Sequence, residues 1–320
     1  MKVTVLSGGV GGARFTRGLL AHLAESAPGS QITVIANTGD DMWLHGVRVC
    51  PDLDTLMYTL GGAVHEQQGW GRREESSRVS QDLAAYGVGW DWFTLGDLDL
   101  ATHLARTQWL REGLSLTETT ARLCERWRLA DQGVRLLPMS DQPVETHVRV
   151  DDGLIHFEEW WVRHRAALPA REFVQVGLAQ AEPAPGVLEA IGEADAVLLP
   201  PSNPVVSVGT ILAVPGVRDA LTTTPAPVVG ISPIIGGAAV RGMAAECLAT
   251  IGVAASAEAV ARHYGRRATG GVLDGWLVDT ADAEAAEKLA ADGWRTAVTD
   301  TLMRDVPHTA RIAATLLNLV

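Results

Sequence analysis

A glycine-rich segment near the start of the chain constrains the fold more than any other feature of the sequence. Residues 7–14 read SGGVGGAR; they follow the apolar run 3–6 and precede a stretch with helical spacing, 15–25. A strand, a glycine turn and a helix in this order aim backbone N–H groups at a phosphate. We therefore expect Gly9, Gly11 and Gly12 to contact a phosphate group, the alternative being a tight turn that binds nothing.

The same segment differs from two common phosphate-binding motifs. Arg14 stands where the dinucleotide-binding fingerprint needs a third small residue, and no lysine follows the glycines as a P-loop requires. These differences disfavour a nicotinamide-dependent oxidoreductase. For Arg14 itself two interpretations stay open, a contact with a phosphate oxygen or a side chain in solvent.

Four carboxylates follow the next predicted strand, 31–36, within a short stretch: Asp40, Asp41, Asp52 and Asp54. Oxygen-rich clusters suit Mg²⁺, which usually takes one or two carboxylates, waters and substrate phosphates. The net charge is −12 and lysine is nearly absent, so a phosphorylated ligand needs arginine, backbone dipoles or a divalent ion for neutralisation. Helix caps and turns, which also favour aspartate, are the alternative.

The pattern of segments predicts an α/β fold with a doubly wound, mostly parallel, Rossmann-like sheet. Buried-strand patterns return at 196–199, 227–231, 272–278 and 296–299, and helical patterns at 281–291 and 307–317. Residues 74–132 have helical spacing and predict an inserted helical lobe between core segments 1–73 and 133–320. The alternating runs 144–150 and 154–162 flank Asp151-Asp152-Gly153 and predict a β-hairpin.

Three further loops carry polar side chains in positions that favour binding. Ser202 and Asn203 lie between prolines after a predicted strand and suit recognition of a base or phosphate, unless the loop is only a connection. Ser232 precedes a proline and a glycine pair, and this pattern indicates either a second anion pocket or the start of a helix. Asp97 and His103 open a predicted helix, where the acid also complements the helix dipole.

Composition excludes several classes of function. A net charge of −12 argues against nucleic-acid binding, and no run approaches the roughly 20 apolar residues of a membrane span. The three cysteines are widely spaced and odd in number, which disfavours a disulfide framework and fits a reducing cytoplasm.

Taken together, the motifs resemble the 2-phospho-L-lactate transferase family of coenzyme F420 biosynthesis, especially its actinobacterial phosphoenolpyruvate transferase branch, FbiA. The matching segments are collinear and span most of the chain. They read GGVGGAR (8–14), NTGDD (37–41), PDLDTLMYTLGG (51–62), GDLDLATH (96–103), PMSD (138–141), HFEEWWVR (156–163), PSNPVVSVGTIL (201–212) and SPIIGG (232–237). Leu98 and Thr210 depart from the pattern, and Leu98 removes a basic residue from the side that would hold the acceptor.

The resemblance implies a cytoplasmic, homodimeric enzyme that uses Mg²⁺. Its acceptor would be the deazaflavin Fo, and its donor a guanosine diphosphate (GDP) ester of enolpyruvate or lactate. The products would be dehydro-F420-0, or F420-0, together with GMP. The main alternative is a non-catalytic nucleotide-sugar-binding regulator that resembles the gluconeogenesis-factor proteins.

For the transferase we expect specific residues in specific roles. Asp40 and Asp54 would hold the metal, with Asp41 and Asp52 as substitutes, and Asp54 would also touch the attacking hydroxyl. Asp97 and His103 would line the acceptor side together with Asp54. The glycines of the first turn would contact phosphate, while Ser202, Asn203 and Ser232 would hold the nucleotide.

Overall fold

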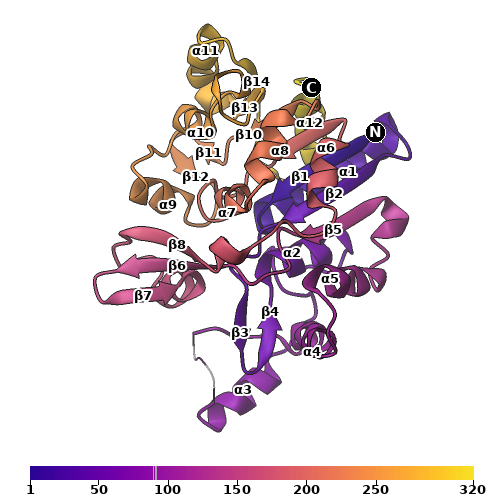
Figure 1. Ribbon diagram of the computed structural model, residues 1–320, viewed down its shortest axis with the longest axis vertical. Coiled ribbons are helices and arrows are strands. Elements are labelled where there is room, and N and C mark those ends of the chain that lie inside the picture. The colour runs from indigo at the N-terminus through magenta and orange to yellow at the C-terminus, as the bar shows by residue number, and fades with distance from the viewer. Residues whose placement is uncertain (89, 91) are drawn as a thin grey trace.

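A seven-stranded parallel sheet forms the centre of the fold (Figure 1). The structure is a computed structural model that describes residues 1–88, 90 and 92–320. The sheet has the order β14-β13-β10-β9-β1-β2-β5, and every neighbouring pair is parallel. Its strands are β1 (Lys2–Ser7), β2 (Gln31–Ala36), β5 (Val134–Pro138), β9 (Ala196–Leu199), β10 (Val228–Ile231), β13 (Gly275–Asp279) and β14 (Arg295–Thr299).

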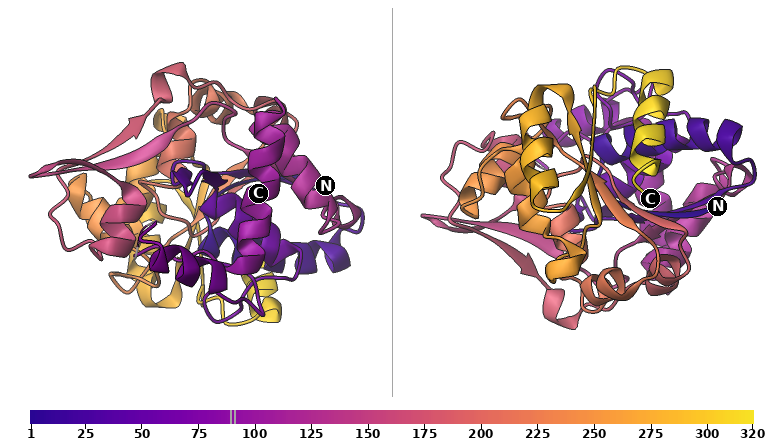
Figure 2. Two further views of the ribbon diagram at one scale, coloured as in Figure 1. Left: turned by 90° about the horizontal axis from the view of Figure 1, so that it is seen from below. Right: turned by 90° about the horizontal axis from the view of Figure 1, so that it is seen from above.

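Helices cover both faces of the sheet, as the two views of Figure 2 show. One face packs on α1 (Val10–Ser26), α2 (Pro51–Leu60), α5 (Leu116–Glu125) and α12 (Val306–Leu317). The other packs on α6 (Val187–Gly192), α7 (Val208–Ala213), α8 (Val217–Thr223), α9 (Ala244–Thr250), α10 (Ala257–Tyr264) and α11 (Ala283–Ala291). Neighbouring residues of β1 divide accordingly: Val5 belongs to the first core and Leu6 to the second. Because both faces are buried, the strands are continuous apolar runs, as parallel sheets require.

The chain reverses its direction of travel across the sheet between β1 and β9. From β1 it proceeds outward to β2 and β5, and after β9 it proceeds the other way to β10, β13 and β14. In open α/β sheets, ligands bind beyond the carboxyl ends of the strands at such a reversal. The loops after β1 and β9 therefore mark the expected position of a binding site.

Smaller elements extend from this end of the sheet. The hairpin of β3 (Met42–Leu44) and β4 (Val47–Val49) packs on α4 (Asp97–Arg111), and α3 (Arg78–Ala85) packs on α4 in turn. A separate antiparallel sheet has the order β7-β6-β8, with β6 (Glu145–Val150), β7 (Gly153–His156) and β8 (Glu172–Val176). It projects from the central body in Figure 1.

The predicted doubly wound α/β fold is confirmed, while two local expectations are wrong and one helix was not predicted. The strand expected over 154–162 ends at His156, and a π-helical turn, Glu159–Arg163, follows it. Phe157, Trp160 and Trp161 have helical spacing, and this turn brings their rings into contact. Ser232 begins no helix; the segment after it forms the hairpin β11 (Ile234–Ile235) and β12 (Ala238–Ala239). Pro51 begins α2, a helix that was not predicted from the sequence.

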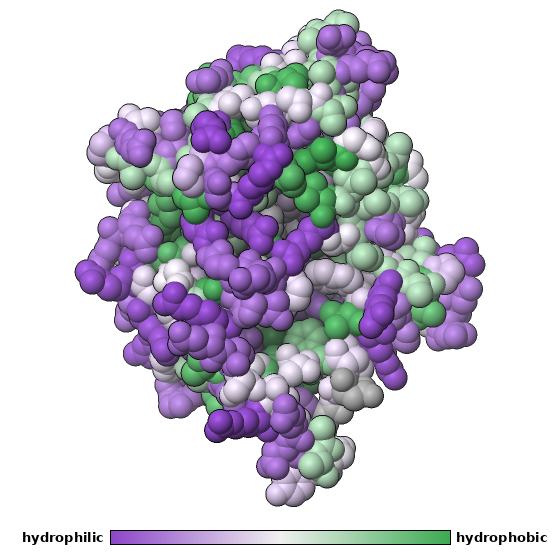
Figure 3. All heavy atoms as spheres, turned by 180° about the vertical axis from the view of Figure 1, so that it is seen from behind, coloured by the Kyte–Doolittle hydropathy of each residue, from purple (hydrophilic) through white to green (hydrophobic). Residues whose placement is uncertain are grey.

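The surface seen from behind is mostly hydrophilic, with separate small apolar patches (Figure 3). Among the described residues, no helix combines the length and the apolar character needed to cross a membrane. The large apolar side chains instead fill the two cores beside the sheet.

Candidate active site

The glycine turn after β1 packs tightly against the loop after β9 and the start of α2. The Gly8 N–H donates to Ser202 Oγ at 3.1 Å. A Cβ at Gly9 would collide with an Asp52 carboxylate oxygen, and one at Gly11 with the Pro201 carbonyl oxygen. The glycines are therefore required for close approach between backbone segments, whether or not a phosphate also binds there.

A group of carboxylates gathers next to this turn. Asn37 Nδ2 donates to Asp52 Oδ2 at 2.9 Å and to Asp40 Oδ2 at 3.3 Å. Burial raises the pKa of Asp40 well above its usual value, and the charges of Asp52 and Glu158 raise it further. Burial likewise raises the pKa of Asp52 to about 6, and burial with the Asp52 charge raises the pKa of Glu158 to about 8. We call Asp40, Asp52 and Glu158 the carboxylate cluster.

Asp54 lies in a different environment, between α2 and α4. Its buried carboxylate forms a two-pronged ion pair with Arg106, which is itself 1% exposed, and lies 3.5 Å from Nδ1 of His103. Burial raises the pKa of Asp54, although the charges of Arg106 and His103 oppose this shift. Asp99 continues the network: its Oδ2 lies 3.5 Å from His103 Nε2, and its Oδ1 accepts from the Tyr58 hydroxyl at 2.7 Å.

The facing helices explain this second network. Asp54 and Tyr58 are four residues apart on α2, while Asp99, His103 and Arg106 follow one stripe of α4 at spacings of four and three. Residues with these spacings share one face of a helix. Two polar stripes therefore meet within the protein, and a buried guanidinium neutralises the carboxylate opposite it.

Asp41 lies near both environments, because its charge raises the pKa of Asp40 and the charge of Asp54 raises its own pKa. It is fully buried, its Oδ2 lies 3.6 Å from an Arg48 nitrogen, and both its oxygens lack hydrogen-bond partners among the described residues. Burial raises the pKa of Asp41 to about 7, opposed by the Arg48 charge. Arg48 also pairs with Glu145 at 3.3 Å, so its charge is shared between two carboxylates.

Several buried oxygens in this region could bind a cation. The atoms without a hydrogen-bond partner in the described part of the chain include Asp40 Oδ1, both Asp41 oxygens and Thr38 Oγ1. Asp54, Asp99 and His103 form a second possible set, because one ligand atom from each lies within 4.8 Å of the others. Arg106 already supplies positive charge to this second set, and Arg48 supplies it to Asp41. The unpaired oxygen of Asp40 is therefore the better match to a hard cation.

The predicted metal ligands Asp40 and Asp54 thus have different contacts. No hydrogen bond or ion pair joins them among the described residues; Asp52 shares Asn37 with Asp40, and Asp54 faces Arg106. Their joint role as metal ligands stays a prediction.

The other predicted binding residues are mostly engaged by the protein. The Asn203 side chain accepts from the N–H groups of Val205 and Val206, and the Ser232 hydroxyl bonds to both backbone atoms of Ile234. Asp97 accepts from Ser76 and from the first backbone N–H groups of α3, and so holds α3 against α4. His103 is 1% exposed and its Nε2 has no hydrogen-bond partner in the described chain.

Three residues with evident roles here were not singled out from the sequence: Arg48, Arg106 and Glu158. Arg106 had a detectable signal, because it continues the stripe of Asp99 and His103 on the predicted helix. Glu158 lies within the segment HFEEWWVR that supported the family resemblance. Arg48 offered no pattern, since its partner Glu145 comes from a distant strand.

Comparisons with known proteins confirm the predicted family. Residues 3–316 match the family described as 2-phospho-L-lactate transferase CofD. A Streptomyces griseus protein named phosphoenolpyruvate transferase is 57% identical over 323 residues, covering 100% of this chain and 98% of the relative. A protein of the same name from Thermobifida fusca is 56% identical, covering 100% of this chain and 98% of the relative. Another from Mycobacterium sp. (strain KMS) is 52% identical, covering 98% of this chain and 96% of the relative.

A solved structure supports the fold independently. A member of the UPF0052 family from Bacillus halodurans superposes with a TM-score of 0.63, at 19% identity and with 98% of both chains covered. At this identity the match bears on the architecture only, and it agrees with the parallel sheet and its flanking helices.

The Arg106–Asp54 ion pair generates a stability prediction. Arg106→Leu should lower the free energy of unfolding by about 3–5 kcal/mol, because it leaves a buried carboxylate unpaired. The double variant Arg106→Leu/Asp54→Asn should recover much of this loss, as the charge is then absent. Urea unfolding of the two single variants and the double variant measures the coupling; additive losses would contradict a direct ion pair.

The carboxylate cluster predicts a pH dependence in the metal-free protein. Because these pKa values are raised, the folded chain keeps a proton on Asp52 up to about pH 6 and on Glu158 up to about pH 8. The unfolded chain releases the same protons at about pH 4. The free energy of unfolding should therefore fall as pH rises from 5 to 8. Glu158→Gln should flatten this fall, each pKa unit corresponding to about 1.4 kcal/mol.

Urea titrations at several pH values, with a chelator present, test the expectation. Glu182→Gln is the matched control, because Glu182 is exposed and lies outside the carboxylate cluster. A wild-type protein whose stability is constant from pH 5 to 8 would contradict the proton uptake.

Proposed function

Because the chain belongs to the 2-phospho-L-lactate transferase CofD family, we propose that it transfers a phosphoenolpyruvyl group from a GDP ester to the deazaflavin Fo. The terminal ribityl hydroxyl of Fo would be the acceptor, and dehydro-F420-0 and GMP the products. The enolpyruvyl donor is preferred to the 2-phospholactyl donor because relatives at 52–57% identity carry the name phosphoenolpyruvate transferase.

The observation that carries this proposal is the position of unpaired carboxylate oxygens beside the glycine turn. Asp40 follows β2, Asp52 touches Gly9, and both lie beyond the carboxyl ends of strands next to the reversal between β1 and β9. A site with N–H groups for phosphate and oxygens for a cation suits transfer of a substituted phosphate group.

The residues present fit a divalent cation such as Mg²⁺. Asp40 offers an unpaired oxygen, and we propose that Asp40 and Asp54 hold the ion. Asp52 or Asp41 would replace Asp54 if Arg106 keeps the Asp54 carboxylate engaged. When bound, the ion would neutralise charge on the diphosphate and on the leaving GMP.

The protein's own groups would position the acceptor hydroxyl and receive its proton. The ribityl oxygen forms a bond to the phosphorus that carries the enolpyruvyl group, the bond from that phosphorus to the GMP oxygen breaks, and the hydroxyl proton passes to Asp54. Burial raises the pKa of Asp54 and makes its carboxylate a stronger base than one in water. Arg106 and His103 hold this carboxylate in place.

The remaining predicted residues take supporting roles in the proposal. Gly9, Gly11 and Gly12 would present N–H groups to the phosphates, and Ser202, Asn203 and Ser232 would shape the nucleotide side. His103, whose Nε2 makes no hydrogen bond among the described residues, would contact the acceptor side. Asp97 would act there by holding α3 against α4.

We further propose a cytoplasmic homodimer. All three cysteines are buried free thiols, as expected for a reducing compartment. Light scattering of the purified protein would measure the subunit number.

The activity itself is tested with purified protein, Fo, Mg²⁺ and each of the two donors. We expect a product with the mass of dehydro-F420-0, and GMP in equal amount, from the enolpyruvyl donor. No product from either donor would contradict the proposed transfer.

Asp40→Asn and Asp54→Asn should each lower turnover roughly 100-fold or more, because each removes a charge that the transfer uses. Circular dichroism checks that both variants fold, and a Mn²⁺ titration measures cation binding separately from turnover. Asp152→Asn, at an exposed turn of the β6–β7 hairpin, is the control and should keep full activity. Full activity in either test variant would remove that residue from the site.

A further inference from the structure

Two arginines from distant parts of the chain face the same backbone position. Arg14 is in the second turn of α1, and Arg241 follows the β11–β12 hairpin. A Cβ at Gly69 would lie 3.0 Å from Arg241 Nη1 and 3.5 Å from Arg14 Nη2. Arg14 donates to the Glu66 carbonyl oxygen at 3.2 Å, and the Arg241 guanidinium lies 5.2 Å from the centre of the Trp70 ring. We call Arg14 and Arg241 the arginine pair.

The arginine pair differs from the other arginines nearby in having no carboxylate partner among the described residues. Arg17 forms a two-pronged ion pair with Glu66, and Arg304 pairs with Asp300 at 2.5 Å. Burial lowers the pKa of Arg14, and the charges of Arg241 and Arg17 lower it further, against the opposing charge of Glu66. Two like charges in contact with the same backbone segment favour an anion between them.

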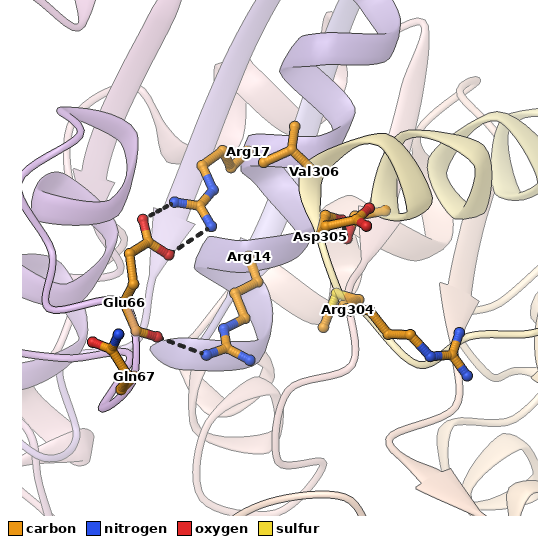
Figure 4. Close-up of a pocket in the computed structure, with 9 residues that line it drawn as sticks. Arg14, Arg17, Glu66, Gln67, Arg304, Asp305 and Val306 are labelled. Carbon is orange, nitrogen blue, oxygen red and sulfur yellow. Dashed lines mark hydrogen bonds and ion pairs between the residues drawn. The ribbon is translucent and has the colours of Figure 1, made fainter.

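A polar cavity of about 240 Å³ opens beside Arg14 (Figure 4). It lies between α1 and the start of α12. The close-up shows the Arg17 guanidinium at the Glu66 carboxylate and the Arg14 guanidinium at the Glu66 backbone carbonyl. Asp305 caps α12 through the His308 N–H and so is engaged. Arg14 lines this cavity and Arg241 does not, so the excess positive charge in it comes from the side of Arg14.

The arginine pair is also connected to the proposed site through the first residues of α1. Gly9 meets Asp52 of the carboxylate cluster, and the next residue, Val10, packs on Gly69, the glycine that both guanidiniums approach. Arg14 follows Gly9 by five residues, about 7.5 Å along the helix axis. A diphosphate at the glycine turn is thus within reach of the Arg14 side chain.

We propose that Arg14 and Arg241 form a phosphoryl-oxyanion site that binds the phosphates of the guanosine diphosphate donor. This assignment rests on the proposed function. Guanidinium groups bind phosphate oxygens through paired N–H donors, and a chain with a net charge of −12 needs such local neutralisation to attract a diphosphate. The pair acts in donor binding and takes no part in proton transfer.

Calorimetric titration with GDP, inorganic pyrophosphate and Fo separately tests the site. Arg14→Gln and Arg241→Gln should each weaken GDP binding roughly tenfold or more, and pyrophosphate should compete with GDP in the wild type. Binding of Fo should stay unchanged, which also shows that the variants are folded. Arg14→Lys keeps the charge but loses the paired donors, so its affinity for GDP should lie between those of the wild type and Arg14→Gln.

Arg218→Gln is the matched control, because Arg218 is an exposed arginine on α8 and its loss changes the net charge equally. In turnover assays the donor KM should rise in the test variants with a smaller effect on kcat. Wild-type affinity for GDP in both variants would overturn the proposal while leaving the transferase activity intact. Pyrophosphate binding through the arginines without any GDP binding would support the anion site and reject the guanosine donor.

Discussion

The close approach of backbone segments at the reversal between β1 and β9 is the constraint on which the rest of the site depends. Gly9 and Gly11 leave no space for a Cβ, because Asp52 and the Pro201 carbonyl oxygen occupy it. The start of α2 and the loop after β9 can therefore both reach the end of β1. Through Asn37, the same packing brings Asp52 against Asp40 after β2. A side chain at either glycine would separate the segments that carry the polar groups.

The carboxylates brought together in this way differ in which groups surround them. Asp54 receives a buried guanidinium from α4, so its charge is compensated within the protein. The cluster of Asp40, Asp52 and Glu158 has only the Asn37 amide among its described side-chain donors, and burial raises the pKa of all three acids. Without a ligand, this cluster favours protons, and a cation would compete with those protons for the same oxygens. The two environments thus differ in whether a cationic side chain already compensates the carboxylate charge.

Local patterns predicted the frame of the site, and tertiary contacts decided its details. The apolar runs of β2 and β9 and the glycine turn were evident because each follows from neighbouring residues. Asp52 and Asp54 were recognised as a group, yet two residues on a helix point about 200° apart. Since α2 was not predicted, the sequence offered no means to assign Asp52 to Asp40 and Asp54 to Arg106. Glu158 and Arg48 meet the acids only through long-range packing, which no local spacing records.

The start of α1 keeps the arginine pair and the carboxylate cluster apart. The carboxylate cluster touches α1 at Gly9, and the arginine pair meets Gly69, which packs on Val10. Had the guanidiniums reached the cluster, they would be expected to form ion pairs as Arg106 does with Asp54. The backbone at the start of the helix keeps the opposite charges apart. A ligand that carries both a diphosphate and a bound cation would satisfy each side with the charge it lacks, which neither side obtains from the other.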